Sequence, residues 1–303
     1  MEPIRDVSRY HIRLEAAHTI IAQACLGVLL RMDDRIDCNS IENFPLAQYA
    51  ARFWPTHAQV ENVSSHIKDG MERLFDAEKP HFATWLWVYN RDRGYFMSTM
   101  RPEEPEAVPL YYAAMHGFRD LAKYLIVEHP EHVNARGGDC DTPIHVAVIA
   151  KHANILSLLI EHGADIEGQS NMVANGTPLH LAAWEGRVEA GRCLLDHGAN
   201  ISARDDVRDT PLINAALQGH LEFARMLLEH GAVIDAQNGL GETALYSAVR
   251  GGKIEVVQWL LEHGADVNAR NLNGNTLSNL ALFYGNQEIV ELMSAYGAEF
   301  VEK

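Results

Sequence analysis

The chain has 303 residues, 47% of them hydrophobic, which is enough material for a core in one domain with further structure beside it. Its 41 acidic and 25 basic side chains give a formal net charge of −16, which argues against a nucleic-acid backbone or an anionic membrane as direct partner. The four cysteines form no CxxC pair, and we find no signal peptide or membrane-spanning segment, so we expect a reduced, cytoplasmic setting and leave nuclear entry open.

The first part of the chain contains no internal repeat and predicts an α-helical domain over residues 1–103. Residues 5–31 form an amphipathic segment with apolar side chains at helical spacing, and residues 33–37 follow as a polar break. A capped helix over residues 43–57 is expected to end before Pro55, because proline disfavours helical geometry in the residue before it. Further helices are expected near residues 57–75 and 80–89, followed by a linker at residues 101–105.

A phrase of about 33 residues recurs from residue 104 to the end of the chain. Its clearest copies are residues 177–183, which read Thr-Pro-Leu-His-Leu-Ala-Ala, and residues 210–216, which read Thr-Pro-Leu-Ile-Asn-Ala-Ala. This wording at this period resembles the ankyrin repeat, so residues 104–303 are expected to hold about six such repeats. The anchor threonines are Thr142, Thr177, Thr210, Thr243 and Thr276, at spacings of 35, 33, 33 and 33 residues.

Each repeat predicts a pair of short helices. The threonine is placed to cap the first helix, the proline after it suits the first helical position, and a glycine ends the helix. Lys151 replaces that glycine in one repeat and predicts a slightly altered turn. The loop that leads from one helix pair to the next is called the finger, and two extra residues between Asp165 and Asn175 predict a longer, more mobile finger in that repeat. No pair can bury its apolar face alone. We therefore expect an all-α fold, an ankyrin-repeat solenoid of about six repeats capped by the N-terminal helical domain.

The helical segment before the repeats carries a second resemblance. Its motifs are similar to the segment between the nucleotidase and the ankyrin array of fungal NACHT–ankyrin proteins, which are signalling receptors resembling innate-immune receptors. The resemblance covers the whole chain but only the C-terminal part of such a receptor. The chain has no GxxxxGK[ST] phosphate loop, so the resemblance does not imply a nucleotide switch. The motifs are Ala24-Cys25-Leu26, Phe44-Pro45-Leu46, Tyr49-Ala50-Ala51 and Trp54-Pro55-Thr56-His57.

Sixteen histidines raise the question of metal or catalytic chemistry. Six of them recur at one of two repeat positions, and recurrence at a repeat position favours a structural role. The pair Asp33/Asp34 is interpreted as a solvated turn because no second ligand cluster lies near it. We therefore expect no catalytic residue, no metal ligand and no cofactor. The recurring histidines are His162, His197, His230 and His263 before a glycine, and His145 and His180 after Thr-Pro.

The end of the first helix and the finger tip are the parts of an ankyrin repeat that line its concave face, and here they predict a binding surface for another protein. Trp184, Arg250 and Tyr284 are the expected anchors, because Trp, Tyr and Arg dominate binding hot spots. The expected helix-end residues are Met115, His116, Ile149, Trp184, Glu185, Leu217, Arg250, Phe283 and Tyr284, and the finger residues are Asp209 and Glu242, with Asp141, Arg208 and Leu240 beside them.

The leading hypothesis is a non-catalytic adaptor or regulator that grips a partner protein along this surface. One alternative is an enzyme on an ankyrin scaffold, with His116, Glu185 and Arg250 placed beside Trp184 and Tyr284 to hold a small substrate and move a proton. Another is a chain whose N-terminal domain binds the partner while the repeats only scaffold. The sequence leaves the partner, the pathway and the oligomeric state open.

Overall fold

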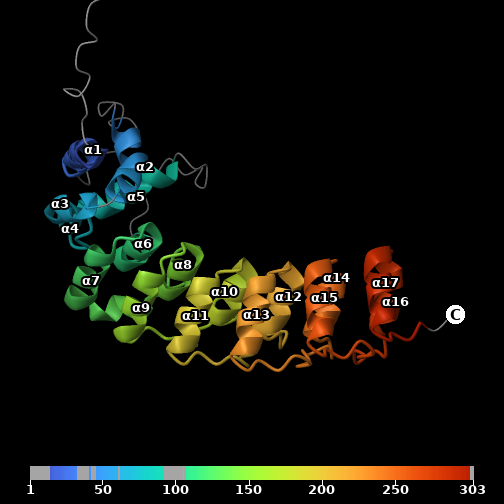
Figure 1. Ribbon diagram of the computed structural model, residues 1–303. Helices are drawn as coiled ribbons and strands as arrows, with labels where there is room; N and C mark the ends of the chain where they lie inside the picture. Colours follow the sequence, from blue (N-terminus) through green and yellow to red (C-terminus); the bar gives the residue numbers. More distant parts are fainter. Residues whose placement is uncertain are drawn as a thin grey trace, which may run out of the picture. The chain divides into compact units, whose positions relative to one another are not determined.

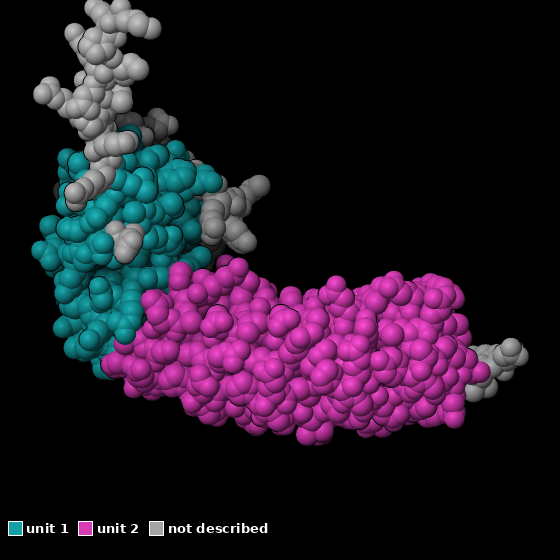
Figure 2. Space-filling view, in the orientation of Figure 1, with its two compact units in different colours: residues 1–138 teal, residues 139–303 magenta. Residues whose placement is uncertain are grey.

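The computed structural model describes residues 14–32, 41, 46–60, 62–91, 105 and 107–300. Within these residues the regular structure is helical, with two isolated β-bridges at Ser170/Gly176 and Arg270/Thr276, and the expected all-α class is confirmed. The chain divides into two compact units, residues 1–138 and 139–303 (Figure 2). Asp33/Asp34, the Phe44-Pro45 motif and most of the expected linker lie outside the described residues.

Unit 1 contains the N-terminal helices and the first helix pair of the repeats, α6 and α7. The helix that contains Pro55 does not end before it, as the sequence analysis expected, but continues to Ala58. Proline lacks the N–H that would bond the carbonyl of Ala51, and the Trp85 indole N–H donates to that carbonyl instead, at 3.0 Å. The elements are α1 (Leu14–Leu29), α2 (Ala47–Ala58), α3 (Val63–His66), α4 (Lys68–Leu74), α5 (Pro80–Arg91), α6 (Pro109–His116), α7 (Arg119–Glu128) and the 3-10 turn η3 (Pro130–Asn134).

A buried aromatic cluster joins the N-terminal helices of unit 1 to α6 and α7. Trp54 stacks on Phe118 with ring centroids 5.1 Å apart, and Trp85 meets Tyr112 edge-on at 5.9 Å. All four side chains are buried, and such ring pairs contribute about 0.5–1.5 kcal/mol each beyond the area they bury. The Gln59 side-chain amide also donates to the carbonyl of His116 at 2.8 Å. The N-terminal helices therefore cover the first helix pair, as expected of a cap.

Unit 2 is a stack of five helix pairs, which stand side by side from α8/α9 to α16/α17 (Figure 1). The first helices of successive pairs pack against one another in one row, and the second helices form the other row. The elements are α8 (Pro143–Ile149), α9 (Ala153–Glu161), the 3-10 turn η4 (Asn171–Val173), α10 (Pro178–Glu185), α11 (Val188–Asp196), α12 (Pro211–Gln218), α13 (Leu221–Glu229), α14 (Ala244–Arg250), α15 (Ile254–Glu262), α16 (Leu277–Tyr284) and α17 (Gln287–Ala295).

Hydrogen bonds at the threonines and between the fingers hold the stack in register. The hydroxyl of Thr210 accepts from the N–H of Ile213 at 3.3 Å, which caps α12 as expected. In three fingers a backbone N–H donates to a backbone carbonyl of the preceding finger, and these hydrogen bonds recur at the sequence period. The pairs are Asp206 to Ala174 at 2.9 Å, Gly239 to Val207 at 3.0 Å and Leu272 to Leu240 at 2.8 Å.

The finger with two extra residues is longer, as predicted. It contains η4 and is closed by the Ser170/Gly176 bridge, with the Ser170 hydroxyl accepting from the N–H of Met172. Its greater mobility stays a prediction.

The turn at Lys151 keeps the geometry that the other repeats build with glycine. Lys151 has φ 66°, the same left-handed value as Gly186 at the equivalent position. The prediction of an altered turn is therefore wrong at this residue, because the backbone conformation is unchanged. A residue with a Cβ atom adopts the strained left-handed conformation that glycine adopts elsewhere. That conformation costs a non-glycine residue about 1–2 kcal/mol.

We predict that Lys151→Gly raises the free energy of unfolding by about 1 kcal/mol, since glycine adopts this φ without the Cβ strain. Urea unfolding of the purified chain measures the change. Lys151→Ala is the matched control, because it removes the same charge and keeps the Cβ atom, and it should give little gain. Equal stability of all three proteins would contradict the assignment of strain to this residue.

Candidate protein-binding surface

The ends of the first helices of unit 2 carry one or two predicted binding residues per repeat. These residues recur at the repeat period, and because their helices pack side by side they form a row, which we call the strip: Ile149, Trp184, Leu217, Arg250 and Phe283, with Tyr284 beside the last. Trp184 is 37% exposed, Phe283 82% and Tyr284 53%. The rings of Phe283 and Tyr284 meet edge-on with centroids 5.3 Å apart. The strip thus presents aromatic area to solvent at two well-separated repeats.

The charged members of the predicted surface already have partners inside the stack. The Arg250 guanidinium donates to the Glu242 carboxylate at 2.6 Å, and Glu242 is almost fully buried. Asp209 is buried too, and its carboxylate accepts from the Asn238 amide at 2.7 Å. Burial raises the pKa of Asp209, an effect that the Asn238 hydrogen bond opposes. These groups therefore tie neighbouring fingers and helices together.

The remaining predicted residues are placed differently. Glu185 binds Arg187, two residues along, at 2.9 Å. Met115 and His116 belong to α6 in unit 1, where His116 is only 9% exposed. Its ring lies 5.8 Å from Phe118 and 6.1 Å from Trp85, so it packs in the aromatic cluster of unit 1.

The finger tips carry a second apolar series that the sequence analysis largely missed. Val207 and Leu240 are half exposed, and Leu272 is 76% exposed. Met172, on the longer finger, is 45% exposed. Of these only Leu240 was among the predicted finger residues. The signal was available in the sequence, because the four apolar residues recur at close to the repeat period in segments that are otherwise polar.

The recurring histidines are structural, as expected. In the slot after Thr-Pro, the backbone N–H of Thr177 donates to Nδ1 of His180 at 3.1 Å, and His180 Nε2 lies 3.0 Å from the carbonyl oxygen of Asp209 in the next finger. His145 bonds Gly168 in the same manner. In the other slot, four rings bond the carbonyl oxygen four residues earlier through Nδ1. The distances are 2.8 Å for His162, 2.8 Å for His197, 2.7 Å for His230 and 2.8 Å for His263.

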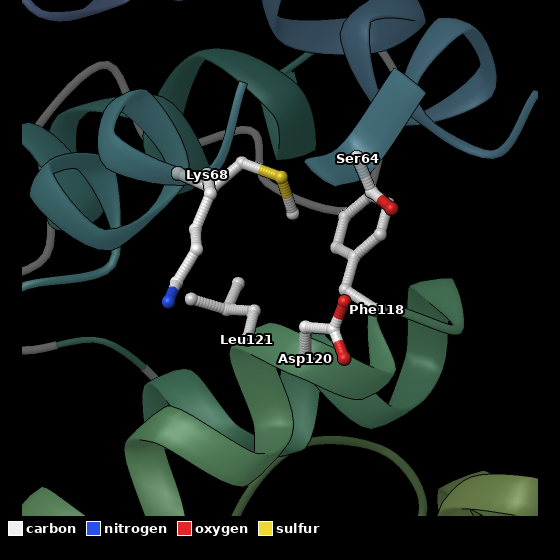
Figure 3. A pocket seen from close by; sticks show the side chains of 6 residues that line it. Ser64, Lys68, Phe118, Asp120 and Leu121 are labelled. Atoms are coloured by element: carbon white, nitrogen blue, oxygen red, sulfur yellow. The ribbon is translucent and has the colours of Figure 1, made fainter. Parts of the chain in front are cut away.

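Two hollows formed by described residues are small. One, in unit 1, is surrounded by Ser64, Lys68, Phe118, Asp120 and Leu121, and its volume is about 10 Å³, the space of a single water (Figure 3). The other, in unit 2, is about 200 Å³ and lies beside Ile201 and Val233, away from the strip. Both are below the roughly 300–1,000 Å³ of most small-molecule sites. Among the described residues, no helix is long and apolar enough to cross a membrane.

Comparison with known proteins agrees with this fold. Residues 110–303 match the family described as ankyrin repeats (3 copies), in overlapping matches at residues 110–205, 168–238, 203–271 and 234–303. The chain therefore belongs to the ankyrin-repeat family. An ankyrin repeat domain from Acinetobacter baumannii AYE is 32% identical, with a TM-score of 0.55 over 63% of this chain and 98% of that one. The ankyrin repeat domain of Bcl-3, described as a member of the IkappaB protein family, is 29% identical, with a TM-score of 0.59 over 65% and 89%.

Curated relatives include fungal proteins. Azaphilone pigments biosynthesis cluster protein L of Monascus ruber is 31% identical over 180 residues, which is 54% of this chain and 37% of that protein. The target of rapamycin complex 2 subunit AVO2 of Saccharomyces cerevisiae is 36% identical over 101 residues, which is 33% of this chain and 23% of that protein. The chain thus spans well under half the length of these relatives.

The His180 hydrogen bonds predict a pH dependence. Burial lowers the pKa of His180, because the charged ring would lose its hydration in the folded chain. Its Nδ1 can accept from the Thr177 N–H only while it carries no proton. In the unfolded chain histidine has its ordinary pKa of about 6.5, so on acidification the unfolded chain takes up this proton first. The contribution of His180 to the unfolding free energy is therefore present above about pH 6.5 and is lost as the pH falls below it. Between about pH 7.5 and 5.5, His180→Asn should therefore flatten the fall in unfolding free energy by up to about 1.4 kcal/mol per pH unit.

Urea unfolding at several pH values measures this slope. His197→Asn is the control, because its exposed ring bonds only its own helix, and it should leave the slope unchanged. A slope in His180→Asn equal to that of the natural chain would show that His180 takes up its proton as readily folded as unfolded.

Proposed function

We propose that this chain is a non-catalytic adaptor or regulator that binds a partner protein along the strip and the finger tips of unit 2. The observation that carries the proposal is an exposed apolar side chain on each of four successive finger tips, Met172, Val207, Leu240 and Leu272, with exposed aromatic rings of the strip in two repeats. A solvated face does not need this pattern, whereas contiguous exposed apolar area marks binding surfaces. Trp184 and Tyr284 are the proposed anchors, with Leu217, Phe283 and the finger-tip residue Leu240 as apolar floor.

The chemistry of the surface describes the partner. Its apolar residues fit a protein segment that offers aliphatic or aromatic side chains. The net charge of −16 favours a segment with basic residues around that apolar centre, since complementary charge speeds and orients encounter. Arg250 takes a different role from the one expected of it, holding the buried Glu242 in place so that the strip keeps its shape. We propose a cytoplasmic setting for this interaction.

The relatives support a regulatory role in this class. One is a subunit of a target of rapamycin complex, and another belongs to a pigment biosynthesis cluster. The resemblance of the N-terminal motifs to fungal NACHT–ankyrin proteins supports a signalling setting. The enzyme alternative is less well supported, because His116, Glu185 and Arg250 already pack or pair within their own units.

The proposal predicts that Trp184→Ala/Tyr284→Ala weakens partner binding without unfolding the chain. Truncation of a hot-spot residue costs 2 kcal/mol or more, so loss of two anchors should raise the Kd of a partner about 100-fold or more. Partners retained by the natural chain from its own cell extract are identified by mass spectrometry, and the Kd is then measured with both proteins purified.

Tyr296→Ala is the matched control, because Tyr296 is an equally large and comparably exposed aromatic residue beyond the end of α17. It should bind within about threefold of the natural chain, a change of roughly 0.6 kcal/mol. Equal affinity of the Trp184→Ala/Tyr284→Ala variant would refute the strip as the binding surface. If the retained partner is a second copy of the chain, light scattering will show a mass that falls in the double variant only.

A further inference from the structure

The turn that follows α7 in unit 1 departs from every other turn at its place in the repeat. After the second helix, residues 263–266 read His-Gly-Ala-Asp, and the other repeats of unit 2 vary this wording only slightly. Residues 129–132 read His-Pro-Glu-His at the same place, with the same Val-Asn-Ala-Arg sequence following in both. Three residues that build a turn elsewhere are thus replaced here by a proline, a carboxylate and a second imidazole.

The replacement changes where the first histidine points. In four repeats of unit 2 the ring Nδ1 of this histidine bonds the carbonyl four residues earlier. The backbone N–H of His129 donates to the equivalent carbonyl, of Leu125, at 2.8 Å, as the same N–H does at His197, His230 and His263, so the difference lies in the ring. The ring instead turns toward Glu131, with His129 Nδ1 3.4 Å from Glu131 Oε1.

The 3-10 turn η3 brings the second histidine to the same side. Residues three apart eclipse each other in a 3-10 helix, and the rings of His129 and His132 accordingly stack with centroids 4.8 Å apart. His132 Nε2 lies 3.8 Å from the same oxygen of Glu131. The turn is closed by the N–H of His132 donating to the His129 carbonyl at 3.0 Å, and the buried side chain of Val133 anchors it to the unit.

We propose that His129, Glu131 and His132 form a binding site for a divalent transition-metal ion of the zinc class. Their ligand atoms lie within 4.8 Å of one another. Donor atoms about 2.0–2.1 Å from a tetrahedral zinc ion lie roughly 3.3 Å from one another. The distances from Glu131 Oε1 to the two imidazole nitrogens, 3.4 and 3.8 Å, are already close to this value. The distance between the two imidazole nitrogens can shorten by rotation of the side chains, which are partly exposed to solvent. The same exposure leaves the ion an open path of entry.

The donor set selects the metal. Two imidazole nitrogens and one carboxylate suit zinc, nickel or copper, whereas magnesium and calcium require oxygen ligands. Three protein ligands leave the fourth position of a tetrahedral ion to water or to a group from another molecule. The expectation of no metal ligand rested on histidines that recur at repeat positions, whereas Glu131 and His132 have no counterpart in the other turns at this place.

The test is a zinc titration of the full chain by calorimetry, with cobalt absorption as a readout of tetrahedral coordination. The natural chain should bind one zinc ion per chain at this site, and His129→Ala/His132→Ala should weaken that binding at least tenfold and lose the cobalt bands. His162→Ala/His197→Ala is the matched control, since it removes two histidines from the equivalent slot of two other repeats, and it should bind as the natural chain does. Circular dichroism without metal checks that each variant folds.

Glu131→Gln gives an independent reading, because it changes one exposed atom and keeps the turn. It should weaken zinc binding at least tenfold, and excess magnesium should not displace zinc from the natural chain. Undiminished binding in both His129→Ala/His132→Ala and Glu131→Gln would overturn the proposal, as would a natural chain that binds no zinc. Loss of the ion in His57→Ala alone would place it at the His18/His57 pair, whose Nδ1 atoms lie 2.8 Å apart, and would overturn it too.

Discussion

A helix pair of an ankyrin stack has two apolar sides, and the fold is stable only where both are covered. Inside unit 2 the three pairs from α10/α11 to α14/α15 have a neighbouring pair on both sides, and the small residues Ala182, Ala215 and Ala248 of their first helices are fully buried. In unit 1 the first pair is covered by helices that do not belong to the repeats. There Ala113 keeps the place of these alanines and is fully buried, and an aromatic cluster around Trp54 and Trp85 joins the covering helices to α6 and α7.

The same constraint explains the far end of the stack. Glu288, Glu291 and Ser294 on α17, the last helix of unit 2, are exposed. Leu282 is also exposed, although its counterpart in the preceding repeat, Val249, is buried. An end repeat thus combines a polar outer helix with apolar residues left open on the inner one. The open residues adjoin Phe283 and Tyr284, so the exposed end extends the apolar area of the strip.

Sequence reasoning succeeded where a residue's role depends on its place in the period. The capping threonines and the histidines of both slots recur, and each copy tests the interpretation of the others. It failed where the deciding partner is remote in sequence or irregular. The period does not show that the Trp85 indole N–H donates to the Ala51 carbonyl, which Pro55 cannot bond. Nor does it show that Glu242 is already paired with Arg250. The period also did not show that His116 lies apart from the strip, because the burial of His116 depends on helices outside the repeats.

The buried polar groups explain how a surface of exposed apolar residues keeps one shape. Asp209 links its own finger to the next through Asn238 and shares the neighbourhood of Arg250 and Glu242. The removal of either member of a buried pair leaves the other unsatisfied, at a cost of roughly 1–3 kcal/mol, so these links resist slippage between repeats. For the proposed binding surface, repeats that keep their register would lower the conformational entropy lost when a partner binds. Under the proposed function, the same buried hydrogen bonds would fix the shape of the fingers before a partner binds.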